Sequence, residues 1–181
     1  LLGIGVCSFK NSGLTEIVIP DKVTDILDSA FVNCSSLKSV TIGKSVEFNA
    51  LPPTTFVGCS NVNDLIIGDS KESLEIQCIY RFGQIKNNTT FGYFTKLRRL
   101  YVGRNLVNRT GNNHIFPDDM QIEHLELGRF VQYFTFGNID FKTITVYRKV
   151  PLVIESYHAQ HQDFTIKTKM DAILYVPEGY V

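Results

Sequence analysis

Two histidines and a carboxylate lie within six residues near the end of the chain, at His158, His161 and Asp163. Imidazole and carboxylate groups are zinc ligands, so this cluster is the strongest sequence argument for a metal-dependent hydrolase. The spacing is not that of a defined zinc motif, and a polar loop explains it as well. His114 follows two asparagines, which is typical of a loop rather than of a general base. We therefore expect no enzyme activity, no metal and no cofactor.

The charge and the hydrophobic pattern exclude two classes of partner. Lysine plus arginine and aspartate plus glutamate both total 18, so the formal net charge is zero and no basic footprint for nucleic acid is present. No stretch approaches the roughly 18 apolar residues of a membrane span, so we expect no membrane insertion. The chain begins at Leu1 without a basic and apolar leader, and we expect any signal peptide to lie outside it.

One seven-residue pattern recurs along the chain and organises the rest of the sequence. It reads apolar-x-x-apolar-x-apolar-glycine or proline, and its alternation is that of a short, half-buried strand. The copies are LTEIVIP from Leu14, LKSVTIG from Leu37, VNDLIIG from Val62, LRRLYVG from Leu97, IEHLELG from Ile122, FKTITVY from Phe141 and DAILYVP from Asp171. Their spacing is about 24 residues at first and about 19 to 35 later, around the roughly 20 to 29 residues of leucine-rich repeats.

A single strand of this kind cannot bury its apolar side, so the copies must stack into a parallel ladder with a continuous interior. Cys34 and Cys59 stand three residues before two of the copies, and we expect buried thiols at these equivalent positions. The long third unit predicts an extra strand from Leu74. A phenylalanine six residues before each of four copies predicts a stacked column of Phe31, Phe56, Phe91 and Phe116.

Residues 14–37 hold a fuller version of the repeat, LTEIVIPDKVTDILDSAFVNCSSL. This segment resembles the BspA-like branch of leucine-rich repeats, with Leu27 in place of the family's glycine as the one departure. The resemblance is strong over regular units at 1–68 and weaker over degenerate units at 69–181. It implies a single-domain repeat solenoid from a longer array, a right-handed superhelix with a parallel β ladder and few or short helices. It also implies a bacterial cell-surface or secreted adhesion protein.

Positions two, three and five of each copy project from the outer face of the predicted ladder. Arginine and tyrosine are residue types in which binding energy concentrates, so two neighbouring copies supply the sharpest candidate. The candidate binding residues are Arg98, Arg99, Tyr101, Glu123, His124 and Glu126. The alternative is that Arg98 and Arg99 pair with Glu123 and Glu126 as a surface ion-pair ladder of small energetic value, with His124 solvated.

Three functions remain open at this point. The first is a module for binding or adhesion to an unknown protein or glycan ligand, through the ladder face or the long loop at 83–96. The second is a structural spacer that displays another domain. The third is the metal-dependent hydrolase suggested by the histidine cluster.

Overall fold

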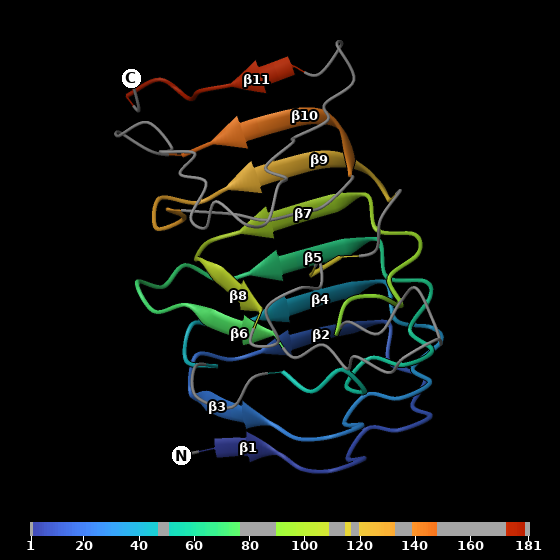
Figure 1. Cartoon of the computed structure of the whole chain (residues 1–181). Coiled ribbons are helices and arrows are strands. Elements are labelled where there is room, and N and C mark those ends of the chain that lie inside the picture. The colour runs from blue at the N-terminus through green and yellow to red at the C-terminus, as the bar shows by residue number, and fades with distance from the viewer. Residues whose placement is uncertain are drawn as a thin grey trace, which may run out of the picture.

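The computed structural model describes residues 2–46, 51–76, 90–108, 115–116, 120–132, 139–147 and 173–179. These ranges contain eleven β-strands and no helix. Seven of the strands form one sheet and are stacked in sequence order (Figure 1). They are β2 (Glu16–Ile19), β4 (Ser39–Ile42), β5 (Asp64–Ile67), β7 (Arg99–Val102), β9 (Gln121–Leu127), β10 (Asp140–Val146) and β11 (Ile173–Tyr175). Each strand falls on one copy of the seven-residue pattern, so the predicted ladder is confirmed through its last copy.

The pairings in this sheet are all parallel and keep the register of the repeat. Ile17 pairs with Val40, and Val40 with Leu65, so position four of one copy lies beside position four of the next. These side chains are buried, and so are those at position six, such as Ile42. Because successive side chains point to opposite faces of a strand, positions three and five lie on the outward face of the ladder.

Two short strand pairs form another wall of the solenoid. β1 (Leu2–Ile4) pairs in parallel with β3 (Val23–Ile26), and β6 (Leu74–Ile76) with β8 (Leu106–Asn108). Buried residues of these strands belong to the same hydrophobic core as the ladder. β6 is the extra strand expected from Leu74, and it lengthens the third unit without interrupting the ladder.

The phenylalanine column is confirmed and begins one ring earlier than predicted, at Phe9. The rings of Phe9 and Phe31 have centroids 5.3 Å apart and planes within 8°, and those of Phe31 and Phe56 are 5.4 Å apart and within 7°. The next step, to Phe91, widens to 6.3 Å and 28°. Phe94 packs against both rings at this step, edge-on to Phe56 at 5.2 Å. The column is therefore regular up to Phe56 and irregular at the step to Phe91, after which Phe91 and Phe116 stack again at 5.5 Å and 19°.

The two equivalent cysteines, Cys34 and Cys59, are buried as predicted. Their thiols also donate hydrogen bonds that the sequence does not reveal, to the backbone oxygens of Phe9 and Phe31 respectively, each at 3.1 Å. Burial, followed by the neighbouring Cys34, raises the pKa of Cys59 to about 12. Each thiol thus satisfies a carbonyl of the preceding coil while packing as a small apolar group.

Arg104 is fully buried, and its guanidinium ties together the turns that follow the ladder strands. Its Nε donates to the oxygen of Gly68 at 3.1 Å, its Nη1 to that of Val46 at 3.2 Å, and its Nη2 to that of Gly43 at 2.5 Å. The equivalent position in the β9 copy is Arg129, whose side chain is 65% exposed. Equivalent arginines therefore have opposite environments, one inside the solenoid and one on its surface.

Candidate functional site

The six predicted binding residues lie on β9, on β7 and at the residue before β7. None of them is buried. Arg98, Arg99 and His124 are exposed, and the other three are half-buried. Positions three and five place Arg99, Tyr101, His124 and Glu126 on the outward face, whereas Arg98 and Glu123, at position two, lie at the edge where the strands begin.

The alternative interpretation, in which these arginines form ion pairs with Glu123 and Glu126, is not confirmed, although the charge of Arg98 acts on Glu123. Arg99 Nε lies 3.4 Å from Asp64 Oδ1 on β5, the residue directly opposite it in the sheet. On its other side, Arg99 faces His124 rather than an acid. Glu123 Oε1 lies 2.9 Å from Lys142 Nζ on β10. Arg99 and Glu123 thus each pair with a strand on the side away from the other, because a ladder strand has two neighbours and the nearest opposite charge decides between them.

Tyr101 and Glu126 hold hydrogen bonds within the protein. The Tyr101 hydroxyl donates to Asp69 Oδ1 at 2.7 Å, and the Tyr147 hydroxyl donates to Glu126 Oε2 at 3.1 Å. Burial raises the pKa of Tyr101 above its ordinary value, and the adjoining Asp69 carboxylate raises it further. Tyr101 and Glu126 are therefore held in place near the carboxyl ends of their strands and expose only part of their surface to solvent.

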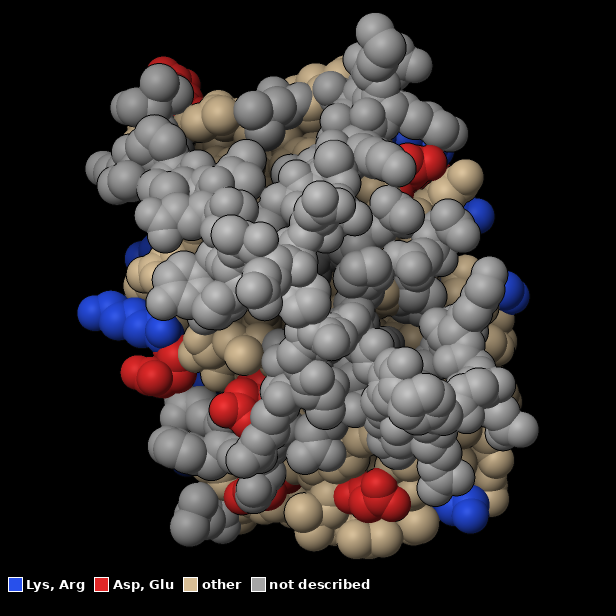
Figure 2. Space-filling view, viewed as in Figure 1, with Lys and Arg blue, Asp and Glu red and all other residues tan. Residues whose placement is uncertain are grey.

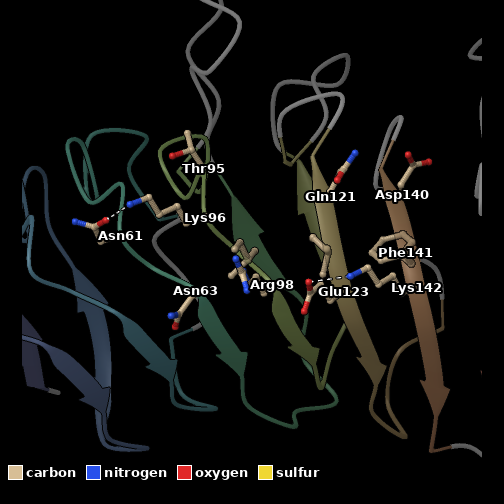
Figure 3. A pocket seen from close by; sticks show the side chains of 12 residues that line it. Asn61, Asn63, Thr95, Lys96, Arg98, Gln121, Glu123, Asp140, Phe141 and Lys142 are labelled. Carbon is tan, nitrogen blue, oxygen red and sulfur yellow. Dashed lines mark hydrogen bonds and ion pairs between the residues drawn. The ribbon is translucent and has the colours of Figure 1, made fainter.

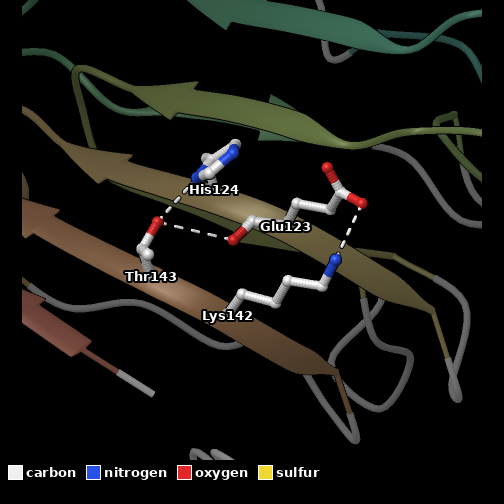
Figure 4. Close-up of polar contacts among 4 residues, drawn as sticks. All are labelled: Glu123, His124, Lys142 and Thr143. Atoms are coloured by element: carbon white, nitrogen blue, oxygen red, sulfur yellow. Dashed lines mark hydrogen bonds and ion pairs between the residues drawn. The ribbon is translucent and has the colours of Figure 1, made fainter. Parts of the chain in front are cut away.

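His124 is held by the next rung of the ladder (Figure 4). Its Nδ1 lies 2.7 Å from the hydroxyl of Thr143, which is also 3.5 Å from the backbone oxygen of Glu123. The imidazole is exposed on the ladder surface. His124 is therefore oriented by Thr143 rather than left free to rotate.

A groove of about 430 Å³ lies at the edge of the ladder where the strands begin (Figure 3). This volume is within the range of about 300 to 1,000 Å³ found for ligand pockets. The side chains at position two of four successive copies line it: Asn63, Arg98, Glu123 and Lys142. Further polar lining comes from the preceding turns and the strand starts, at Asn61, Thr95, Lys96, Gln121 and Asp140.

Sequence reasoning placed position two, and with it Asn63 and Lys142, on the outer face, but it chose only Arg98 and Glu123 of these groove residues as binding candidates. The usable signal was position two of the repeat, since that position lines the groove in four consecutive copies. The turn residues gave no comparable signal, because the path of each turn determines how near its side chains lie to the first residues of the strands.

Fixed contacts occupy two sides of the groove and leave Arg98 between them (Figure 3). On one side Lys96 Nζ donates to Asn61 Oδ1 at 2.7 Å, and on the other Lys142 bonds Glu123. The hydrogen bond and charge of Lys142 lower the pKa of Glu123, with a smaller contribution from Arg98. The Arg98 guanidinium makes no hydrogen bond or ion pair with any residue in the described ranges.

The described part of the chain contains no cluster of three or more histidine, cysteine, aspartate or glutamate side chains able to hold a metal. The candidate metal ligands His158, His161 and Asp163, and also His114, lie outside the described residues. On the face shown in Figure 2, described basic and acidic side chains are intermixed around the margin, and neither charge forms a block. Among the described residues, no helix is long and apolar enough to cross a membrane.

Comparison with protein families gives one match. The model of the BspA type leucine rich repeat region matches residues 2–101 in six copies, which is more than half of the chain. No curated protein matches the chain. No solved structure matches it either. The matched region ends within β7, so it includes the regular coils and Arg98, whereas the β9 and β10 side of the groove lies beyond it.

Proposed function

Because the chain belongs to the BspA-type leucine-rich repeat family, we propose that it is a non-catalytic module that binds a protein or glycan ligand at a cell surface or after secretion. The observation that carries the proposal is the outward ladder face, where Arg99 and His124 are exposed on rigidly paired strands. A solenoid presents such side chains at fixed spacing along one extended surface. A ligand that spans several rungs therefore meets an ordered array of groups.

Apolar side chains on the same face support this proposal. Position five places Val18, Thr41, Ile66 and Tyr101 in one row across four strands. Val18 is 62% exposed and Ile66 is 41% exposed. Exposed apolar groups beside charged ones are typical of protein interaction surfaces. A bound partner would bury this row and gain hydrophobic free energy, while the neighbouring charges supply specificity.

A pull-down with the whole chain tests the proposal. The ladder-face variant combines Arg99→Ala with His124→Ala, and the matched control combines Lys22→Ala with Lys71→Ala, two exposed lysines away from that face. We expect a partner protein or an arrayed glycan that the wild type captures to be lost by the ladder-face variant and kept by the control. Melting temperatures of both variants establish that the fold is intact.

Equal capture by the wild type, the ladder-face variant and the control would contradict a binding role for this face. In that case the structural spacer is the better reading, and the chain would serve to hold a neighbouring domain away from the surface.

A further inference from the structure

The groove at the strand starts has the dimensions of a short extended chain. Its position-two side chains come from β5, β7, β9 and β10 or from the residues just before these strands, which are consecutive in the sheet. The three steps between these strands cover roughly 14 Å at about 4.8 Å each, which is the length of about four extended residues at about 3.3 Å per residue. A peptide lying across the strand starts would therefore contact all four rungs.

The groove has polar groups that suit a peptide and lacks the aromatic surface that sugars favour. The side-chain amides of Asn63 and Gln121 each offer a donor and an acceptor, as a peptide backbone does. Sugar rings pack their C–H faces against exposed aromatic side chains, whereas Phe141, the aromatic residue that lines this groove, is only 3% exposed. The groove thus offers hydrogen bonds at its surface and no aromatic platform.

Arg98 gives the groove its preference for an acidic ligand. Lys142 is matched by Glu123, and Lys96 is held by Asn61, so these cations already have partners in the protein. Arg98 lies between the two pairs and makes no hydrogen bond or ion pair in the described ranges, and its charge acts on Glu123, which already pairs with Lys142 (Figure 3). Its planar fork of donors fits a carboxylate in a bidentate manner.

The geometry points to a specific ligand class for this groove: an extended segment of about four residues of a partner protein, with an aspartate or glutamate seated on Arg98. This inference rests on the proposed binding function and names the partner's chemistry at one site on the same side of the ladder.

Fluorescence polarisation with capped, fluorescein-labelled peptides tests it. The probes are Gly-Ser hexapeptides with one central aspartate or glutamate, each paired with a twin that carries asparagine or glutamine instead. For the 181-residue chain we expect the acidic peptide to bind about tenfold more tightly than its amide twin, the lower end of what a hydrogen bond to a charged group contributes. The preference should shrink as salt is added.

Arg98→Gln is the test variant and Arg99→Gln its matched control, because both side chains are exposed but Arg99 pairs with Asp64 and does not line the groove. We expect Arg98→Gln to remove the preference for acidic peptides and Arg99→Gln to keep it. The melting temperature of each variant should stay within about 2 °C of the wild type, since an exposed side chain contributes little to stability.

Equal binding of acidic and amide peptides by the wild type would overturn the inference. So would loss of the acid preference in Arg99→Gln alone, or an Arg98-dependent signal on a glycan array with none from the peptides. A partner that is lost by the ladder-face variant but still captured by Arg98→Gln would remove the groove from the binding site and leave the proposed function standing. If neither the ladder-face variant nor Arg98→Gln changes any binding, the peptide inference and the proposed function are both wrong.

Discussion

Replacing Arg104 with methionine tests whether a buried guanidinium holds the turns of the ladder together. The side chain is fully buried and donates to three backbone oxygens, those of Gly43, Val46 and Gly68. Methionine fills much of the same volume but donates nothing, so two buried acceptors and one partly buried acceptor lose a partner. The change therefore isolates the hydrogen bonds from the packing.

The expected loss follows from the number of acceptors. Each buried acceptor left without a donor costs about 1 to 3 kcal/mol, whereas removing the charge relieves the desolvation penalty of the guanidinium. Taking the lower value for each of the three carbonyls gives a net loss of about 3 kcal/mol in the free energy of unfolding. For a chain of this size that corresponds to a fall of about 6 to 12 °C in melting temperature.

Urea unfolding followed by far-UV circular dichroism measures the effect, with tyrosine fluorescence as a second probe in a chain that has eight tyrosines and no tryptophan. Arg129→Met is the matched control, because Arg129 is the same residue type at the equivalent repeat position but is 65% exposed. Its loss should be below about 1 kcal/mol, as for a surface ion pair. Equal losses in the two variants, or a loss below about 1 kcal/mol for Arg104→Met, would refute the reasoning.

Three further predictions concern the packing of the coils. Phe31→Ala should lower the free energy of unfolding by about 3 to 5 kcal/mol in the same urea experiment, because the ring is buried between two stacked neighbours; a loss near zero would show that the column does not stabilise the fold. Gly103→Ala should cost about 1 to 3 kcal/mol, since a Cβ there would lie 2.5 Å from a backbone nitrogen of a neighbouring turn, whereas Gly13→Ala, with nothing within 4 Å, should be neutral. In single-cysteine variants at pH 8, a thiol reagent should label exposed Cys7 rapidly and Cys59 only on unfolding, because Cys59 is buried with a pKa raised to about 12.

The strands and the phenylalanine column were predictable because they depend on local periodicity. Alternation within seven residues determines which side chains of a strand are buried, and the spacing from Phe31 to Leu37 repeats in four units. Once one strand packs, its neighbour must adopt the same register or expose its apolar positions. Even the copy from Asp171, which lacks the first apolar position, takes its place in the ladder as β11.

The ion pairs and the buried arginine were not predictable in the same way. A long side chain such as Arg99 reaches either neighbouring rung, and the sequence does not say that Asp64 rather than an acid on β9 lies nearer. Arg104 and Arg129 both follow a glycine that ends the pattern, yet only Arg104 turns inward. Arg104 meets three backbone oxygens of the preceding turns, whereas Arg129 lies 3.9 Å from the Asp69 carboxylate, and both sets of partners come from other coils.

The regular part of the phenylalanine column also determines how such a chain can change its length. Between Phe9 and Phe56 successive rings meet their neighbours at almost the same distance and angle, so duplicating or deleting one whole coil there leaves each interior ring with an equivalent ring on either side. At the step from Phe56 to Phe91, where Phe94 packs against both rings, the coil is matched to its own neighbours, and exchanging it alone would leave these rings without equivalent contacts. The array is therefore most easily lengthened by tandem duplication in its first coils. The number of coils that form the groove is harder to change.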